Sequence, residues 1–534
     1  MTRFTRRALS AITATALLAG LFFGAPVSVR ATPQTFYVAD PGWLYEPGSS
    51  CESPDYWKDG DWTGGGAYNS DNDAIQDAAD NAASGSVIFI CAGTYNFAEV
   101  VTVSAGKNIT FRGAGTDVTT LDGNDITRIF DSNPVHESDQ GGVLSLRDLL
   151  IMDAQVTEWN GGAIVSDGLA LNNVTITRTT GAYNGGAMYA EGDVSIVDST
   201  FTGNIANADG GVLYAWNGDS TVTISNSVFD DNRAGAVAGG GGGAILGTTV
   251  TVANSVFTGN SSSYGGAIYA TETATVTNST FTDNFAFAGG AIDANITATV
   301  TNSNFTNNSA YMGGAIYGNS TTLTRSTFTS NFAVLGGAIG SAIVSAAANT
   351  FTENEASVGG GAIYAWVSAT LTSSAFTSNA ASFGGAVYAD TATITRSSFT
   401  ANSASESGGA IWSTTRATVT NSTFTSNSAI YRGGAINSET AEISGSHFIR
   451  NSSDQHGGAV YFWGATADDL QRLRRNTFTR NTAPAGGAIT LGSCGPTFSR
   501  NQAARVEGSN RFSGNRATEQ RRTNNVERSE TACG

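Results

Sequence analysis

Lysine is scarce in this sequence, and Lys58 and Lys107 are the only two among 534 residues. Acidic residues outnumber basic ones by 44 to 27, which gives a formal net charge of −17 at pH 7. A surface with this excess of negative charge repels the phosphates of nucleic acids and of anionic membranes. We therefore expect no nucleic acid as a partner, whereas neutral sugars and proteins remain compatible with the charge.

Proline and histidine are rare as well. The chain has 8 prolines beside 65 glycines, and 40% of its residues are hydrophobic. This composition excludes a collagen-like chain and a compositionally disordered one. The three histidines, His136, His447 and His456, have the spacing of neither a metal site nor a catalytic triad. We expect no metal ion and no other cofactor.

The amino-terminal segment has the pattern of an export signal. Arg3, Arg6 and Arg7 precede an apolar run from residue 11 to residue 24, and small residues follow near Ala31. This order is typical of a secretory signal peptide. We predict a signal peptide over residues 1–31 and a protein that is secreted or held at the cell surface. The apolar run is short for a membrane-spanning helix, so we expect no transmembrane segment after cleavage.

The chain has four cysteines, namely Cys51, Cys91, Cys494 and Cys533. In an exported chain they indicate two disulfides, for which three pairings exist. Because two cysteines lie near each end of the sequence, we favour Cys51–Cys91 and Cys494–Cys533. Free buried thiols are the alternative, which an oxidising compartment disfavours.

A repeat of 23 to 25 residues occupies the middle of the chain, as in "TVTNSTFTDNFAFAGGAI" at residues 275–292. A Phe-x-x-Asn motif begins at Phe201, Phe229, Phe257, Phe281, Phe305, Phe328, Phe351, Phe376, Phe399, Phe424, Phe448, Phe478, Phe498 and Phe512. A glycine-pair motif, Gly-Gly-Ala-Ile or a close variant, begins at Gly141, Gly161, Gly185, Gly210, Gly242, Gly265, Gly289, Gly313, Gly336, Gly360, Gly384, Gly408, Gly433, Gly457 and Gly486.

The composition of the repeat favours strands and tight turns. Its segments are short and rich in Thr, Val and Ser, and Gly and Asn interrupt them. Three short strands with three turns fit one repeat, and strands of successive coils then stack about 4.8 Å apart. We predict an all-β parallel β-helix, a solenoid of coils of about 24 residues.

The fixed residues of the repeat have physical reasons in such a fold. We expect Val276, Phe281 and Ile292 to point inward, where their equivalents form apolar ladders from coil to coil. Asn284 follows Phe281 by three residues, where the chain has to turn. We expect it to adopt the left-handed conformation and to bond to its copies in neighbouring coils. We expect the glycine pair to form another corner with positive φ.

The two ends depart from the repeat. Residues 71–85 carry Asp71 or Asn72 as a helix cap and apolar residues at helical spacing, which are Ile75, Ala78, Ala79 and Ala82. We predict a short capping helix, followed by a strand and a turn within residues 86–95. The predicted organisation is an amino-terminal segment and cap over 32–95, a β-helix over 96–490, and carboxy-terminal coils with a polar tail over 491–534.

Both motifs resemble the repeat of the polymorphic outer membrane protein family, known from chlamydial autotransporter adhesins. The stretch "DAIQDAADNAASGSVIFICAGTYNF" at 73–97, followed by "NITFRGAGTDVTTLDG" at 108–123, is similar to the start of pectate-lyase-like β-helices. Together the resemblance covers residues from about 70 to 515. It implies a right-handed β-helix, and it implies either an adhesin or a polysaccharide-cleaving enzyme.

Acidic residues are scattered over the regular coils, at Asp230, Asp231, Asp283, Asp293, Glu353 and Asp390. A lyase of the pectate-lyase-like group would need clustered carboxylates for calcium, and a hydrolase would need a carboxylate pair. Asp231 and Asp283 share a repeat position two coils apart, and we interpret them as solvated turn residues. We expect no catalytic residue, and a polysaccharide lyase or hydrolase with a site in the irregular segment 123–160 is the alternative.

Aromatic residues recur directly after the glycine-pair motif, where strand alternation predicts an outward side chain. These candidate surface-binding residues are Tyr189, Tyr214, Tyr269, Tyr317, Tyr364, Tyr388, Trp412 and Tyr461, and we expect Trp216, Trp366 and Trp463 on the same face. Rows of exposed aromatic rings suit stacking on sugars or anchoring of a protein partner. Stacking that only stabilises the sheet is the alternative interpretation.

Outward Thr-x-Thr pairs form a third pattern, at residues 275/277, 299/301, 322/324, 370/372, 393/395 and 418/420. Regular threonine ranks resemble those of ice-binding proteins, although threonine is also a common outward residue on strands. Our hypothesis is an exported, adhesin-like surface-binding protein without catalytic activity. Its expected partner is a protein or glycan on a host or neighbouring cell.

Overall fold

A computed structural model of the chain describes residues 32–39, 50–52, 54–58, 67–68, 71–133, 142–235, 239–464, 473–492, 509–518 and 525–529. The predicted signal peptide and the predicted Cys494–Cys533 disulfide lie outside these residues. The elements described below belong to one compact unit, Pro33–Gly534. Within the described residues, no helix combines the length and the apolar character that crossing a membrane requires.

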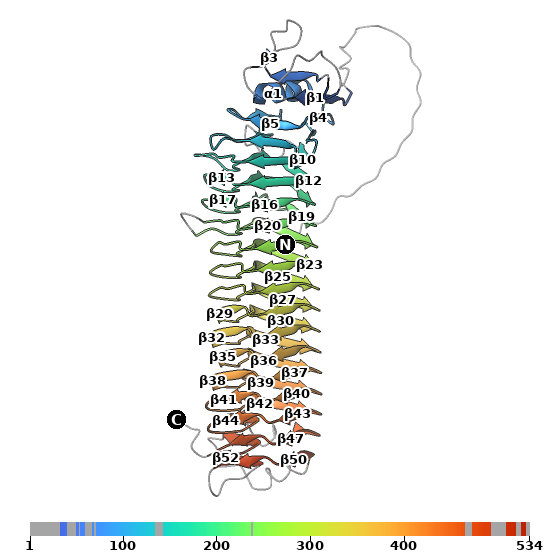
Figure 1. The fold of residues 1–534 in the computed structure, drawn as a ribbon. Helices are drawn as coiled ribbons and strands as arrows, with labels where there is room; N and C mark the ends of the chain where they lie inside the picture. Colours follow the sequence, from blue (N-terminus) through green and yellow to red (C-terminus); the bar gives the residue numbers. More distant parts are fainter. Residues whose placement is uncertain are drawn as a thin grey trace, which may run out of the picture. The chain divides into compact units, whose positions relative to one another are not determined.

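Equivalent strands of successive repeats pair in parallel, so the chain winds into stacked coils (Figure 1). Strand β25 (Ile292–Thr301) pairs with β23 (Ile268–Thr277) on one side and with β27 (Ile316–Thr324) on the other. In this register Ile292 lies between Ile268 and Ile316, as the repeat predicts. The predicted all-β parallel β-helix is confirmed.

Each regular coil contributes a long strand after its glycine pair and a short strand at its phenylalanine, and later coils add a third strand. The other long strands after a glycine pair are β21 (Ile245–Ala253), β30 (Ile339–Ala347), β33 (Ile363–Thr372), β36 (Val387–Thr395), β39 (Ile411–Thr420) and β42 (Ile436–Ser444). The phenylalanine strands are β16 (Thr200–Thr202), β20 (Val228–Asp230), β22 (Val256–Thr258), β24 (Thr280–Thr282), β26 (Asn304–Thr306), β28 (Thr327–Thr329), β31 (Thr350–Thr352), β34 (Ala375–Thr377), β37 (Ser398–Thr400), β40 (Thr423–Thr425), β43 (His447–Ile449), β47 (Thr477–Thr479) and β50 (Arg511–Ser513).

The third strands form a parallel sheet of 8 strands, separate from the main sheet. They are β29 (Phe332–Leu335), β32 (Glu355–Gly359), β35 (Ala380–Phe383), β38 (Ser403–Ser407), β41 (Ser428–Ala429), β44 (Ser452–Ser453), β48 (Thr482–Ala483) and β51 (Arg516–Ala517). Less regular coils use β10 (Val143–Met152), β11 (Ile164–Ser166), β12 (Gly168–Thr177), β13 (Thr180–Gly181), β14 (Met188–Ala190), β15 (Val194–Val197), β17 (Ile205–Ala206), β18 (Leu213–Ala215), β19 (Thr221–Ser225), β45 (Val460–Phe462), β46 (Leu473–Arg474), β49 (Ile489–Gly492) and β52 (Val526–Ser529).

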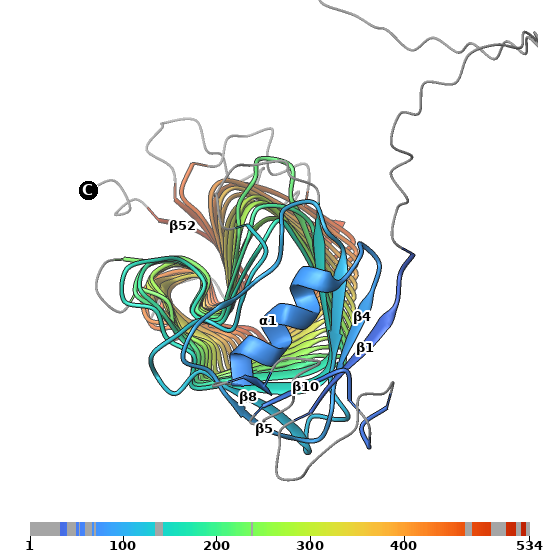
Figure 2. The ribbon, with the colours of Figure 1, turned by 90° about the horizontal axis from the view of Figure 1, so that it is seen from above.

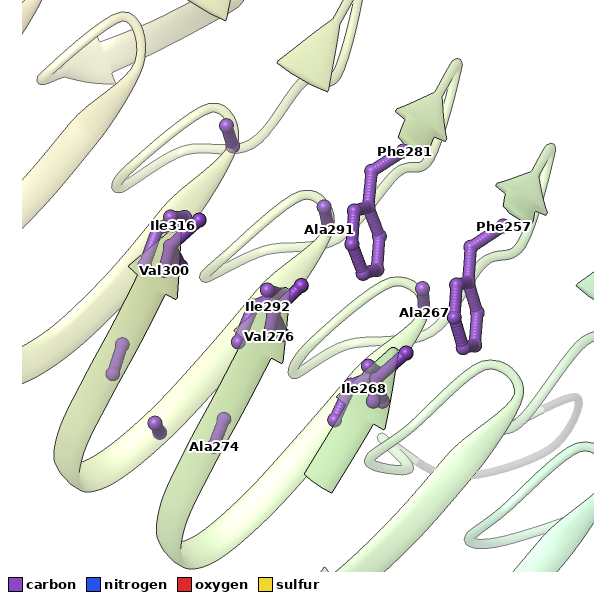
Figure 3. Close-up of a cluster of buried hydrophobic side chains, with 14 of the residues drawn as sticks. Phe257, Ala267, Ile268, Ala274, Val276, Phe281, Ala291, Ile292, Val300 and Ile316 are labelled. Carbon is purple, nitrogen blue, oxygen red and sulfur yellow. The ribbon is translucent and has the colours of Figure 1, made fainter. Parts of the chain in front are cut away.

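Phenylalanine rings form a stack inside the coils. Phe281 is fully buried, and its ring centroid lies 4.8 Å from that of Phe257 and 4.8 Å from that of Phe305. Figure 3 shows the aliphatic ladder beside this stack, with Ile268 and Ile292 at the same point of successive coils. Each buried side chain of this size contributes about 1.5–3 kcal/mol of transfer free energy. The sum over the ladders holds the coils together, as the sequence predicts.

The asparagines of the repeat form a buried ladder of hydrogen bonds. The Nδ2 atom of Asn284 donates to Oδ1 of Asn308 at 3.0 Å and to the backbone oxygen of Phe257 at 3.0 Å. The predicted hydrogen bonding along the axis is confirmed. The left-handed conformation was predicted for the wrong residue, since Asp283 and Asn307, directly before the asparagines, have φ of 56°. The asparagine side chain has to point inward to reach its copies, so the exposed residue before it makes the turn.

The glycine pair forms a corner that no other residue fits. The first glycine has positive φ, as at Gly289 with 61°. A Cβ atom on the second glycine, Gly290, would lie only 2.0 Å from the backbone oxygen of Gly314 in the next coil. Neighbouring coils therefore touch backbone to backbone at this corner, and the prediction is confirmed.

A short helix, α1 (Asp71–Asn81), lies across the end of the first coils (Figure 2). Its apolar face, which includes Ile75 and Ala78, is buried in the same core as the ladders. The predicted helix is confirmed, but the predicted cap is wrong because Asp71 and Asn72 are already helical. The Asn72 side chain instead accepts a hydrogen bond from the backbone nitrogen of Ala98 at 3.3 Å.

The strands near α1 complete this end of the solenoid. They are β1 (Thr35–Ala39), β2 (Tyr56–Lys58), β3 (Ala67–Tyr68), β4 (Val87–Ile90), β5 (Gly93–Asn96), β6 (Val101–Thr102), β7 (Ile109–Arg112), β8 (Thr119–Asp122) and β9 (Phe130–Asp131). Parallel pairing begins here, because β4 pairs with both β1 and β7. The predicted disulfide between Cys51 and Cys91 is present and joins this segment to the end of β4.

Two motif matches do not occupy the positions that the repeat implies. Gly141 lies outside the described residues, and Leu144 of its motif pairs with Leu169 rather than with the column of Ile164. Phe498 also lies outside them, and the ring that stacks on Phe478 is Phe512, at 5.0 Å. In a sequence of this composition, a four-residue motif also occurs by chance. The strand pairing shows which copies of the motif belong to the repeat.

Candidate functional site

The residues that follow the glycine-pair motif lie in one line across the coils. The strand register aligns Tyr189, Tyr214, Leu246, Tyr269, Asp293, Tyr317, Gly340, Tyr364, Tyr388, Trp412, Asn437 and Tyr461. We call this set the aromatic column. The predicted aromatic residues share it, but residues of other kinds interrupt it.

The interruptions divide the aromatic column into separate stacks. Tyr364 and Tyr388 stack with centroids 4.8 Å apart, and Trp412 follows at 6.4 Å from Tyr388. Tyr189 and Tyr214 stack at 5.5 Å. The predicted spacing of about 4.8 Å holds for Tyr364 and Tyr388, and the larger indole of Trp412 is displaced from it.

Two of the predicted tryptophans pack on the column. Trp216 lies 6.2 Å from Tyr214, and Trp366 lies 5.9 Å from Tyr317, as measured between ring centroids. Their exposed fractions are 50% and 39%. Trp463 is exposed to a similar extent.

Most rings of the column are half-buried rather than fully exposed. Burial raises the pKa of Tyr214 to about 12, with smaller contributions from Asp209 and Tyr189. Burial is also the main cause of the raised pKa of Tyr388. These phenols therefore stay neutral over the physiological pH range. Part of each ring is covered by protein, and the remaining surface is available for contact.

Tyr461 contradicts the prediction of an outward ring, because it is fully buried. A Cβ atom on Gly492 would lie 2.5 Å from its hydroxyl, so the next coil covers it. The guanidinium of Arg432 also lies over the ring, 5.2 Å from the centroid. Tyr461 is a packing residue, and we remove it from the binding candidates.

A group of exposed aromatic residues outside the column was missed in the sequence. We call them the loop aromatics, and they are Tyr264, Phe285, Phe287, Tyr311 and Phe332. Phe285 is 58% exposed, and Phe287 and Tyr311 stack with centroids 5.1 Å apart. They lie in the variable stretch between the asparagine and the next glycine pair. An aromatic residue in that stretch of consecutive repeats is the signal that would have revealed them.

Threonines also lie in register from coil to coil. The Thr-x-Thr positions pair as expected, for example Thr275 with Thr299. A longer column follows the phenylalanines, consisting of Thr258, Thr282, Thr306, Thr329, Thr352, Thr377, Thr400 and Thr425. The sequence reasoning overlooked this second column.

Asp231 and Asp283 occupy turns, as predicted, whereas Asp230, Asp293 and Asp390 lie in strands. Asp231 and Asp283 are exposed and have φ of 51° and 56°. Asp293 differs, because it is only 3% exposed and takes a ring position of the aromatic column between Tyr269 and Tyr317. Burial raises its pKa to about 7.

A cavity of about 230 Å³ is lined by carboxylates, among them Asp167, Glu191 and Asp193. Gly142 and Val143 also line it, and the predicted irregular segment 123–160 contains His136, which lies outside the described residues. In the part of the chain that the structure describes, no three His, Cys, Asp or Glu residues are placed to hold a metal ion.

Comparison with known proteins identifies the fold. The family described as "Right handed beta helix region" matches residues 90–281 and 340–503. Among solved structures, the catalytic unit of the GH87 α-1,3-glucanase from Streptomyces thermodiastaticus strain HF3-3 is 16% identical, with a TM-score of 0.34. The match covers 71% of this chain and 66% of the glucanase unit, so the chain spans slightly less than two thirds of that protein.

A mannuronic acid specific polysaccharide family 6 lyase from human gut microbiota is 11% identical, with a TM-score of 0.32. That match covers 83% of this chain and 89% of the lyase. No curated protein matches the chain. At this level of similarity the activity of neither enzyme is transferred to this chain.

Proposed function

The chain belongs to the right-handed β-helix family, and we propose that on this fold it acts as an exported surface-binding protein whose aromatic column contacts the ligand. The observation that carries the proposal is the stack of Tyr364, Tyr388 and Trp412, whose rings are held by one another and are half-exposed. Rings fixed in this way lose little conformational entropy on binding, and they offer both an apolar face and a polar group.

The surroundings of the column support a binding role. Tyr264 and Trp366 add large exposed side chains next to it, with ring centroids 6.1 Å from Tyr269 and 5.9 Å from Tyr317. Soluble monomers rarely expose contiguous apolar patches of this kind, and such patches mark interaction sites. The threefold repetition of an aromatic residue over β33, β36 and β39 also gives a ligand several equivalent contacts along the axis.

The resemblance of the repeats to chlamydial-type adhesin repeats supports the same role. We propose that the partner is a protein or glycan on the surface of a host or neighbouring cell. The net charge of −17 favours neutral or basic partners over acidic ones. A polysaccharide lyase or hydrolase is the alternative, and its best location is the cavity lined by Asp167, Glu191 and Asp193.

The test is a variant with Tyr364→Ser, Tyr388→Ser and Trp412→Ser. We expect attachment to a cell or glycan surface to weaken about tenfold or more, because aromatic anchors dominate interfaces. The matched control replaces Thr370, Thr393 and Thr418, which lie on the same three strands, by serine. Unchanged attachment by the aromatic variant, with a markedly lower melting temperature, would show that the column only stabilises the sheet.

A second candidate is ice binding, which the threonine column from Thr258 to Thr425 favours. Its rows are regular because each threonine pairs directly with the next. Replacement of Thr377 by lysine in the middle of the column should then abolish any thermal hysteresis of the intact protein. Absence of hysteresis in the unmodified protein would remove this candidate.

A further inference from the structure

The aromatic column has a gap at Gly340. The strand register places Gly340 between Tyr317 in the coil before it and Tyr364 in the coil after it. Elsewhere in the column, rings in adjacent coils stack directly, with centroids 4.8 Å apart for Tyr364 and Tyr388 and 5.5 Å apart for Tyr189 and Tyr214. A missing side chain in such a stack leaves a space about one ring thick between its neighbours.

A cavity of about 260 Å³ occupies this place. Its lining residues are Met312, Tyr317, Leu335, Gly340, Tyr364 and Trp366. We call it the Gly340 slot. Trp366 extends from the coil of Tyr364 toward Tyr317, and the two rings lie 5.9 Å apart with 30° between their planes. The slot therefore has three aromatic walls, and the 39% exposure of Trp366 places it at the surface.

The backbone at Gly340 does not require a glycine. Its φ lies outside the left-handed region, unlike that of Gly336 at 68°. A Cβ atom at Gly340 would lie 3.0 Å from the nitrogen and 3.3 Å from the Cα atom of Gly313, and 3.4 Å from Cδ2 of Tyr317, a tight fit for which the neighbours have to move by a few tenths of an ångström. Other coils carry tyrosine or tryptophan at this position. The gap is thus a property of this residue and not of the corner.

The electrostatics of the slot favour an uncharged ligand. None of its lining residues is charged. Burial, and secondarily Asp293 one coil away, raises the pKa of Tyr317, so the phenol stays neutral. The acidic chain disfavours anionic sugars, and the lining offers no carboxylate to pair with a cation.

We propose that the Gly340 slot binds one pyranose ring of a neutral oligosaccharide, inserted between Tyr317 and Tyr364 and against Trp366. The inference rests on the proposed binding function of the aromatic column and names its ligand class. A pyranose ring has apolar C–H faces and a rim of hydroxyl groups, which match walls made of phenol and indole rings. The volume is below the 300–1,000 Å³ of pockets for drug-sized ligands, as expected for one ring.

The surface beside the slot provides contacts for the adjoining sugar units. Met312 of the slot directly follows the exposed Tyr311, and Leu335 ends strand β29, which begins at the exposed Phe332. Val367, which follows Trp366 in the sequence, is 48% exposed. The slot and the surface beside it together form a site for a short oligosaccharide rather than a pocket for a single sugar.

The test fills the slot with the residue that other coils carry. Binding of neutral hexasaccharides of glucose, mannose and N-acetylglucosamine is measured by calorimetry for the unmodified chain and for Gly340→Tyr. The control is Ser345→Tyr, which adds the same ring at an exposed position of the same strand, β30. We expect at least one hexasaccharide to bind, Gly340→Tyr to weaken it about tenfold or more, and Ser345→Tyr to leave it unchanged. Trp366→Ala, which removes one wall, should weaken the same hexasaccharide even where Gly340→Tyr folds poorly.

Equal binding of the hexasaccharide by the unmodified chain and by Gly340→Tyr would overturn the proposal that the slot holds a sugar ring. The serine variants of Tyr364, Tyr388 and Trp412 would still test the binding role of the aromatic column. Failure of every hexasaccharide to bind the unmodified chain would also overturn the slot. If that chain nevertheless attaches to cells, and Gly340→Tyr abolishes the attachment, an aromatic side chain of a protein partner occupies the slot instead.

Discussion

The side chain of Asn308 donates a hydrogen bond from Nδ2 to Oδ1 of Asn331 in the next coil, at 3.0 Å. It also donates to the backbone oxygen of Phe281 at 3.0 Å. Its own Oδ1 accepts from the backbone nitrogen and from Nδ2 of Asn284, at 3.1 and 3.0 Å. One buried amide thus connects three consecutive coils, and its partners belong to the same ladder.

Replacement of Asn308 by alanine should destabilise the protein by several kcal/mol. The change removes the partner of the backbone nitrogen and Nδ2 of Asn284 and of the backbone oxygen of Phe281, and each unpaired buried group costs about 1–3 kcal/mol. Urea unfolding measures the effect. The control is Asn304→Ala in the same coil, where the exposed asparagine should contribute within about 0.5 kcal/mol. Equal stability of both variants would contradict an energetic role of the ladder.

Replacement of Phe305 by alanine should cost about 3–5 kcal/mol, as for other fully buried phenylalanines. Its ring lies 4.8 Å from Phe281 and 4.9 Å from Phe328, so the loss interrupts the stack on both sides. The control is Thr299→Ala, which changes an outward residue on the neighbouring strand β25. Thermal unfolding of both variants compares the inward and the outward face of the coil. A larger loss for Thr299→Ala would mean that the inward and outward assignments are reversed.

The stability contribution of Asp293 should depend on pH. Burial raises its pKa from 3.8 to about 7, so the folded protein holds the proton more tightly than the unfolded chain does. The contribution is therefore fully present below about pH 4 and is lost as the pH rises to about 7, by up to about 1.4 kcal/mol per pH unit. Asp293→Asn removes this dependence.

Melting temperatures of the unmodified chain and of Asp293→Asn, measured at pH 5 and pH 8, check this prediction. We expect the advantage of Asp293→Asn to be larger at pH 8. Asp283→Asn, at an exposed turn, serves as the control. Parallel behaviour of the unmodified chain and Asp293→Asn over this range would show that the carboxyl is not held in an apolar environment.

The core was predictable from the sequence because each coil gives its fixed residues the same surroundings. Phe305, Ile292, Asn308 and Gly290 each contact their own copies in the neighbouring coils. A residue that contacts its copies is constrained at every repeat, so its type recurs and reveals its role. The same reasoning placed α1, whose apolar spacing shows the side that covers the core.

The candidate site was less predictable, because exposure depends on what lies above a residue and not on its place in the repeat. Tyr461 and Tyr364 follow the same motif, yet only Tyr461 is covered by the following coil and by Arg432. The loop aromatics and Gly340 differ from coil to coil, so no repeat pattern reveals them. The surface that these residues form becomes visible only when strand pairing shows which coils are neighbours.

The backbone contact at the glycine corner also controls how the chain tolerates changes in length. Nine residues lie between Asn232 and Gly242, whereas four lie between Asn284 and Gly289. Directly after the longer stretch, the nitrogen of Gly242 donates to the oxygen of Tyr264 at 2.8 Å, and that of Gly243 donates to Gly265 at 3.1 Å. Within the two residues of the glycine pair, the chain returns to the regular pairing between neighbouring coils. Insertions between the asparagine and the glycine pair therefore stay local, and this stretch is where new surface loops can be added without disturbing the rest of the solenoid.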